Sequence, residues 1–296
     1  MEQLGTETKR LDWRRKENRE QTLLFREKNG VPYLSFALLE TCGIVKQGFS
    51  TRMGGVSTGD CASLNLGFSR GDEREAVLEN YRRIGAALDM EVSRMVLSKQ
   101  THTTNVRIVT EADAGNGIVR PLPYTDVDGL VTNVPELPLV TFYADCVPLY
   151  FVDPVHKAIG LSHSGWRGTV GKMGAETLRV MAETYGTRAE EVLACVGPSI
   201  CRDCYEVSLD VAEEFRAAFG EKADRLLLDA KPDGKFQLDL WEANRQVLLE
   251  AGIRAENLAV TDICTCCNPE LLFSHRASRG RRGNLAAFLC LRAFDC

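Results

Sequence analysis

Apolar residues recur every three or four positions in four parts of the chain, which is the period of a helix with one buried face. The clearest set is Val77, Tyr81, Ile84 and Leu88, which follows Asp72, a residue type that commonly caps a helix N-terminus. A glycine follows each of the other three segments closely, as is typical of helix C-termini. We therefore expect helices over residues 72–88, 169–185, 208–219 and 240–251.

Short runs rich in valine, isoleucine and leucine lie between these helices, as buried strands do. Several runs follow one another before the second helix, so strand and helix do not alternate strictly. This order predicts an α+β fold in which stacked mixed β-sheets are flanked by helices. The strand-like runs are 95–97, 106–109, 129–131, 139–143, 149–152, 158–162, 192–196, 258–261 and 285–289.

The length and composition indicate an ordinary globular protein. The chain has 296 residues, of which 44% are hydrophobic and 26% charged, so it can bury an extensive core. We find no linker of low complexity and no repeat of fixed period. The first residues are charged and lack a clear period. We expect a charged N-terminal arm over residues 1–30 and a single domain over residues 31–296.

Charge and hydropathy limit the expected partners and location. The formal net charge is −5, and the one basic tract that stands out is 276–282, so nucleic acid is not an expected partner. A membrane helix needs about 20 apolar residues, and the chain offers no such stretch and no secretory signal. We expect a cytoplasmic protein whose 11 cysteines are thiols or metal ligands. The sequence leaves its oligomeric state open.

Three residues that can bind a metal follow strand-like runs. They are His102, Cys146 and His163. A loop at the end of a strand can turn such side chains into a cleft. Two imidazoles and one thiolate are a recognised zinc set, and three protein ligands leave a fourth position open, as in catalytic zinc sites.

Each of these residues also has a plainer interpretation. A lone buried histidine is usually a hydrogen-bonded core residue, and a lone buried cysteine packs as a small hydrophobe. The spacing of residues 102, 146 and 163 is not a compact zinc signature, so it does not decide the matter alone. The other two histidines are weaker candidates, because His156 lies in a predicted exposed turn and His275 lies outside the strand-end pattern.

Several short motifs support the metal interpretation by their order along the chain. The most specific pair is Ala144-Asp145-Cys146 with His163-Ser164-Gly165-Trp166-Arg167-Gly168. The other motifs span residues 48–52, 63–67, 100–102, 126–130, 146–148, 197–200 and 204–207. Together they resemble the laccase-domain family, also called YfiH-like or polyphenol-oxidase-like proteins, over about residues 40 to 290.

The resemblance implies a fold, a metal and an activity. Family members stack mixed sheets between outer helices, in a fold like that of a cysteine-hydrolase toxin domain. Their zinc ligands match His102, Cys146 and His163. They are described as purine nucleoside phosphorylases acting on adenosine, inosine, guanosine and methylthioadenosine, with adenosine deaminase side activity. Some bacterial members are linked instead to peptidoglycan precursor editing, as amidases.

The leading hypothesis is a zinc-dependent purine nucleoside phosphorylase, with purine nucleosides and phosphate as its partners. In phosphorolysis, phosphate attacks the ribose carbon that bears the purine, and arginines stabilise the charge. In deamination, hydroxide that zinc makes available near neutral pH attacks the ring carbon that bears the amino group.

Substrate contacts are expected from residues of the same motifs. Arg52 and Arg167 are candidates for holding phosphate, because a guanidinium offers a planar fork of donors. Asn65, Gln100 and Arg276 are further candidates for substrate binding. The plainer interpretation of each arginine is a surface residue paired with a carboxylate.

Catalytic roles are expected for Asp145, Cys146 and Arg167. Asp145 can orient a ligand or act as a general acid or base, whereas Asp128 could simply be a turn residue before a glycine. The family's later Thr-Gly-Arg pattern is altered here to Arg282-Gly283-Asn284. Which arginine contacts substrate at that end is therefore left open.

Other classes of function stay open. In a cysteine-type amidase or hydrolase, Cys146 would be the nucleophile and His163 its base. A thiolate that is bound to a metal is not available as a nucleophile. A non-enzymatic partner protein would turn over no nucleoside at all. Copper laccase chemistry is disfavoured, because 4 histidines cannot supply the imidazoles of a multicopper cluster.

Two cysteine clusters raise the question of a second metal. They are Cys201-x-x-Cys204 and Cys264-x-Cys266-Cys267, and four thiolates at such spacings can bind structural zinc. The clusters are some sixty residues apart, so the sequence does not decide their role.

Overall fold

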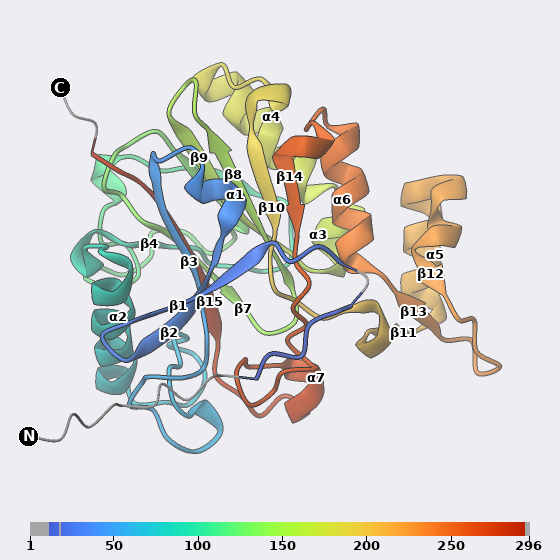
Figure 1. Ribbon diagram of the computed structural model, residues 1–296, viewed down its shortest axis with the longest axis horizontal. Helices are drawn as coiled ribbons and strands as arrows, with labels where there is room; N and C mark the ends of the chain where they lie inside the picture. Colours follow the sequence, from blue (N-terminus) through green and yellow to red (C-terminus); the bar gives the residue numbers. More distant parts are fainter. Residues whose placement is uncertain (1–11, 18, 294–296) are drawn as a thin grey trace, which may run out of the picture.

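The computed structural model describes residues 12–17 and 19–293, and its central feature is a pair of six-stranded β-sheets packed face to face (Figure 1). Helices cover the outer face of each sheet, which gives four layers. Both sheets mix parallel and antiparallel pairs of strands. The expected α+β fold with stacked mixed sheets flanked by helices is confirmed.

The first sheet brings together the two ends of the described chain. Its C-terminal strand lies in the centre, between two strands from the first half, and an N-terminal hairpin forms one edge. In spatial order the strands are β1 (Leu23–Lys28), β2 (Val31–Phe36), β3 (Val45–Ser50), β15 (Leu285–Leu291), β7 (Leu139–Tyr143) and β4 (Val96–Leu97).

The second sheet is built around a long antiparallel pair, β8 and β9, that is buried along its whole length. Because the two strands are covered on both faces, they read as nearly continuous hydrophobic runs. In spatial order the strands are β14 (Leu258–Val260), β10 (Leu193–Val196), β8 (Val147–Asp153), β9 (Ala158–Ser164), β6 (Gly129–Thr132) and β5 (Val106–Ile108).

The alternation of side chains along β15 shows how the layers are joined. Leu285 and Leu289 pack into the core between the two sheets, whereas Phe288 and Cys290 pack into the outer core beneath the first long helix. Successive residues of a strand point to opposite faces, so one apolar strand can serve two cores. The strand is buried throughout for this reason.

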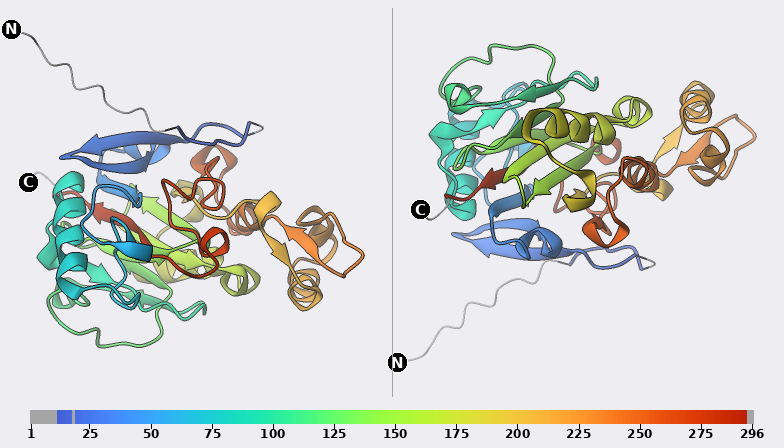
Figure 2. Two further views of the ribbon diagram at one scale, coloured as in Figure 1. Left: turned by 90° about the horizontal axis from the view of Figure 1, so that it is seen from below. Right: turned by 90° about the horizontal axis from the view of Figure 1, so that it is seen from above.

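Helices complete the two outer layers. The first sheet is covered by α2 (Arg74–Leu88), and the second by α4 (Met173–Tyr185) and α6 (Leu240–Glu250). At one end of the molecule, α5 and a small three-stranded sheet project from the sandwich (Figure 2). The remaining elements are α1 (Ala37–Glu40), α3 (Trp166–Val170), α5 (Leu209–Phe219), α7 (His275–Ser278), β11 (Glu206–Val207), β12 (Leu227–Leu228) and β13 (Phe236–Leu238).

The predicted helices agree with the structure except in two details. The helix expected from residue 72 begins at Arg74, and the Asp72 carboxylate binds the side chains of Ser57 and Asn65 instead. The helix expected over 169–185 is broken, because Lys172 has a left-handed φ of 59° that separates α3 from α4. The nine strand-like runs all overlap strands, whereas β1–β3 and β11–β13 were not predicted.

The N-terminal arm expected over residues 1–30 ends inside the first sheet. Residues 1–11 and 18 lie outside the described part of the chain, whereas Leu23–Lys28 forms β1 and pairs with β2 over its full length. The division into an arm and one domain over 31–296 stays a prediction. Among the described residues, no helix combines the length and apolar character needed to cross a membrane.

Candidate metal centre and its cavity

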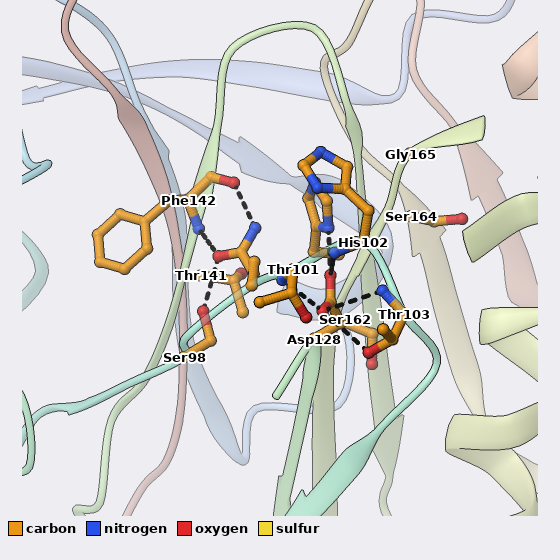
Figure 3. A network of polar contacts seen from close by, with 12 residues as sticks. Ser98, Thr101, His102, Thr103, Asp128, Thr141, Phe142, Ser162, Ser164 and Gly165 are labelled. Atoms are coloured by element: carbon orange, nitrogen blue, oxygen red, sulfur yellow. Dashed lines mark hydrogen bonds and ion pairs between the residues drawn. The ribbon is translucent and has the colours of Figure 1, made fainter. Parts of the chain in front are cut away.

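A buried carboxylate, Asp128, lies at the base of the candidate site, directly before β6 (Figure 3). Its oxygens accept hydrogen bonds from the backbone N–H groups of Thr101 (2.8 Å), His102 (3.1 Å) and Thr103 (3.2 Å). One oxygen also lies 2.8 Å from Nδ1 of His163. Burial acts to raise the pKa of Asp128, but His163 and these hydrogen bonds outweigh it and lower the pKa. One anion thus fixes both a loop and an imidazole.

The loop that carries His102 is folded tightly around that anion. His102 has a φ of 68°, in the left-handed region that non-glycine residues rarely adopt. A second carboxylate, Asp126, supports the same turn and accepts hydrogen bonds from Thr103 Oγ1 (2.7 Å) and Asn105 Nδ2 (2.6 Å). The backbone cost at His102 is therefore met by a dense set of local hydrogen bonds.

Cys146 and His163 come from adjoining parts of the second sheet. Cys146 lies in the turn between β7 and β8, and His163 lies opposite Pro148 of β8. The expectation that His163 follows its strand is wrong, because it is part of β9. Cys146 Sγ and one ring nitrogen each of His102 and His163 lie within 4.8 Å of one another. The structure thus brings the three predicted metal ligands together.

Without a metal ion, the electrostatic interaction between Cys146 and His163 favours a thiolate and an imidazolium. Burial acts to raise the pKa of Cys146, but the charge of His163 and hydrogen bonds with both histidines lower it from 9.0 to about 6. Burial acts to lower the pKa of His163, but the Cys146 thiolate and Asp128 raise it from 6.5 to about 9. The sulfur is therefore anionic near neutral pH, the form that binds metal.

The donor set fits a zinc ion. Asp128 engages Nδ1 of His163 and leaves Nε2 for a metal, an arrangement in which a carboxylate fixes the tautomer and orientation of a ligating histidine. Two imidazoles and one thiolate are borderline-soft ligands of the kind zinc prefers. The three residues can hold a metal, and its identity as zinc stays a prediction.

Gly165 leaves room beside the candidate metal ligands that a larger residue would fill. A Cβ at this position would lie 3.1 Å from Cys146 Sγ and 3.1 Å from Cδ2 of His102. Its φ of −76° is open to any residue, so the need here is for space rather than for backbone freedom.

Asp145 fixes the chain directly before Cys146. It is 9% exposed and has a φ of 90°. One carboxylate oxygen accepts a hydrogen bond from Thr265 Oγ1 and the other from the Arg276 backbone N–H, both at 2.6 Å. Both oxygens are thus engaged by the protein, which is how a positioning residue is held. Its expected role as a general acid or base stays a prediction.

A cavity of about 760 Å³ opens beside the three candidate ligands. One part of its wall is aromatic, from Phe68, Tyr124 and Phe142. Another part is strongly basic, and the lining contains no carboxylate among the described residues. The basic side chains are Arg70, Arg74, Lys99, Arg120 and Arg282.

Arg282 and Arg70 place two positive charges in the same basic wall. Arg282 donates from a terminal nitrogen to the Gly283 carbonyl and to Asn284 Oδ1. Burial and the positive charge of Arg70 lower the pKa of Arg282 to about 10. The buried Nε of Arg282 has no acceptor among the described residues. The weaker, opposing influence of Cys146 and Asp145 places Arg282 near the metal set. A guanidinium with an unused donor and a second positive charge in the same cavity lining favours an anion.

Two of the predicted substrate residues lie in loop contacts instead of in the cavity wall. Arg52 donates from Nε to the Ala62 carbonyl and from a terminal nitrogen to the Pro269 carbonyl, both at 2.8 Å. Its guanidinium also stacks on the Phe273 ring, at 4.6 Å from the centroid. Asn65 is fully buried and binds the backbone of Gly67. Their contact with substrate stays a prediction.

The other predicted substrate residues are divided between the cavity and the surface. Gln100 lines the cavity, although its amide is paired with the backbone of Phe142. Arg167 is exposed and stacks on Trp166, at 4.3 Å from the ring centroid. Arg276 is exposed and donates to the carbonyl of Glu206 at 2.9 Å. The sequence contained Arg282 in the altered motif at 282–284, but left open which arginine at that end contacts substrate.

Comparison with known proteins gives a consistent set of relatives. Residues 46–292 match a family model described as multi-copper polyphenol oxidoreductase laccase. The chain is 35% identical to purine nucleoside phosphorylase YlmD of Bacillus subtilis, over 83% of this chain and 88% of that protein. It is 33% identical to adenosine deaminase RL5 of an unknown prokaryotic organism, over 78% of this chain and 88% of that one. The crystal structure of YlmD from Geobacillus stearothermophilus superposes with a TM-score of 0.84 at 33% identity, covering 92% of this chain and all of that chain.

We expect Gly165→Ala to weaken metal binding without unfolding the protein. The added methyl would press on Cys146 and His102, whereas the backbone at this position accepts alanine. Gly168→Ala is the matched control, because its methyl would make contacts of 3.5 Å or longer. Metal content after dialysis against a chelator measures the effect. Equal retention of metal by both variants would contradict this account of the space around the ligands.

In metal-free protein we expect the Cys146 thiol to react with iodoacetamide with a midpoint near pH 6. The thiolate becomes populated as pH rises through the lowered pKa of about 6. Replacing His163 by alanine removes the stabilising charge, so the midpoint should move upward, toward the ordinary thiol value. Mass spectrometry of the peptide containing Cys146 separates it from the other thiols. A midpoint near 9 in the unaltered protein, or no shift in His163→Ala, would refute the pairing.

Proposed function

The chain belongs to the family described as multi-copper polyphenol oxidoreductase laccase, and from this premise we propose that it is a zinc-dependent purine nucleoside phosphorylase with adenosine deaminase side activity. One observation carries the proposal. Beside the metal set lies a cavity that combines an aromatic wall with arginines that no carboxylate among the described lining residues neutralises. Its substrates would be adenosine, inosine, guanosine or methylthioadenosine, together with phosphate.

The metal would be held by His102, Cys146 and His163. Zinc at this position supplies Lewis-acid chemistry and makes a hydroxide nucleophile available near neutral pH. The protein contributes by holding the ligands in place. Asp128 keeps His163 in one tautomer and holds the backbone of the His102 loop. Gly165 leaves space beside the side chains of Cys146 and His102.

The aromatic wall suits the purine. Phe68, Tyr124 and Phe142 line the cavity, and aromatic rings stack on nucleobases with little dependence on base identity. Arginine side chains lie over the first two rings, Arg74 at 4.9 Å from the Phe68 centroid and Arg107 at 4.8 Å from the Tyr124 centroid. The Tyr124 hydroxyl donates to the Leu97 carbonyl at 2.6 Å, so its ring is fixed in the wall. A purine held against this wall would lie within the same cavity as the metal set.

Phosphate would bind to Arg70 and Arg282. Their mutual repulsion is relieved when an anion lies between them, and the unused Nε donor of Arg282 gains an acceptor. The same two groups would then stabilise the charge on phosphate as it attacks the ribose carbon and the purine leaves. This places the clamp on residues other than the sequence-based candidates Arg52 and Arg167.

Copper oxidase chemistry, which the family description mentions, is not supported by the histidines of this chain. The whole sequence contains 4, and two of them belong to the metal set. His156 lies in a separate turn, with Nδ1 2.8 Å from a carboxylate oxygen of Asp153. A multicopper centre needs several imidazoles for each group of ions.

A cysteine-type hydrolase or amidase, such as one that edits peptidoglycan precursors, is the second candidate. The observation that favours it is the alignment of Cys146, His163 and Asp128 as nucleophile, base and orienting carboxylate. The two candidates make opposite demands on the metal, because zinc occupies the sulfur that the hydrolase would use. Activity should rise with metal content in the first case and fall with it in the second.

The proposal predicts that Arg70→Lys and Arg282→Lys each reduce phosphorolysis of adenosine by about 10- to 150-fold while changing deamination much less. Lysine keeps the charge but loses the bidentate fork, a loss of about 1.5–3 kcal/mol for a charge-assisted hydrogen bond. Adenine, ribose 1-phosphate and inosine are measured in parallel, with and without phosphate, at known zinc content. Arg52→Lys and Arg167→Lys serve as the comparison.

Three outcomes would overturn parts of this account. Equal losses in both reactions would assign the cavity arginines to the shared nucleoside or to the fold. A loss confined to the Arg52 or Arg167 variants would move the clamp to those residues. No dependence on phosphate in the unaltered protein would reject the phosphorylase and favour the hydrolase.

A further inference from the structure

A second group of side chains that could hold a metal lies next to the segment that precedes Cys146. Cys201, Cys204, Cys264 and Cys267 have sulfurs that all lie within 4.8 Å of one another. Cys201 and Cys204 flank a short turn after β10, and the other two lie in the loop after β14. The two pairs are about sixty residues apart in sequence, so the fold itself brings the four thiols together.

The separations between the sulfurs match a single tetrahedral ion. Four sulfurs at about 2.3 Å from one zinc lie about 3.8 Å from each other. The Sγ of Cys267 lies 3.9 Å from that of Cys201 and 3.5 Å from that of Cys204. A cluster of several irons would hold some of its four cysteines further apart, because their sulfurs are divided between different irons. The geometry therefore fits one ion and not a cluster.

The backbone around Cys264 is arranged as it is around a metal thiolate. Its Sγ accepts hydrogen bonds from the backbone N–H groups of Cys201 (3.2 Å) and Cys267 (3.4 Å). Such donors stabilise negative charge on sulfur. The Lys16 side chain also interacts with the Cys201 sulfur, and adds a positive charge beside a group that would carry two net negative charges.

Packing alone does not account for this arrangement. Cys201 and Cys264 are buried, as small hydrophobic residues would be, but Cys204 and Cys267 are partly exposed. Cys204 and Cys267 pack against the same core as Cys201 and Cys264, but partly exposed thiols gain less from apolar burial than buried ones. All four are free thiols, so a pair of disulfides does not explain their approach either.

We propose that these four cysteines bind a structural zinc ion that braces the catalytic loop. Thr265, between two of the cysteines, donates to the Asp145 carboxylate, and Ile200, next to Cys201, donates its N–H to the Asp145 carbonyl at 3.0 Å. Both contacts hold the residue directly before Cys146. The second zinc would thus join the two segments that position the chain at the first metal.

Metal content tests this proposal independently of any activity. Protein purified without added metal should contain two zinc ions per chain, and Cys146→Ala and Cys267→Ser should each contain one. Cys266→Ser is the matched control, because it lies in the same loop outside the set of four and should keep two. Zinc X-ray absorption of Cys146→Ala should show four sulfur neighbours at about 2.3 Å, which keeps the test informative if Cys267→Ser fails to fold.

Several results would overturn the proposal. They are one zinc in the unaltered protein with none in Cys146→Ala, nitrogen or oxygen neighbours in the absorption spectrum, iron in place of zinc, or a disulfide between these cysteines. If the unaltered protein contains two zinc ions but does not turn over nucleosides, the proposed function is rejected and the proposal of a second zinc site stands.

Discussion

The buried carboxylate of Asp128 is the interaction on which the candidate site depends. It joins segments far apart in sequence, because it binds the backbone of residues 101–103 and the imidazole of His163 in β9. A buried anion without partners would be strongly unfavourable, so the chain satisfies it by closing the His102 loop over it. Once that loop is closed, both histidines stand beside Cys146 before any metal arrives.

The four-layer fold explains why such a site can be held rigidly. Cys146 and His163 are fixed by the buried antiparallel pair β8 and β9, whose two faces contribute to two different cores. The cavity wall is built differently, since Arg70 and Arg282 lie on loops. His163 thus stands on the sheet and Cys146 directly before one of its strands, where positions are precise, whereas His102 and the cavity arginines stand on loops.

The sequence predicted the fold class, the long helices and the three residues that the structure brings together as candidate metal ligands, because periodicity and short motifs are local signals. It could not predict the role of Asp128, which looked like a turn residue until distant segments closed around it. For the same reason, it could not show which arginines line the cavity. Arg52 stands in a recognisable motif but is engaged by loop carbonyls, whereas Arg282 stands in an altered motif and lines the cavity.

The most direct test of the central claim is the zinc affinity of Asp128→Asn, read from protection of Cys146 against alkylation as free zinc is varied. This readout reports on the first metal set alone, whatever the other cysteines bind. Asp126→Asn is the control, because Asp126 binds side chains of the same turn but not the His102 backbone or His163. The account predicts that protection in Asp128→Asn requires about 10- to 100-fold more zinc, with Asp126→Asn close to the unaltered protein. Equal protection of Cys146 in all three proteins would contradict it.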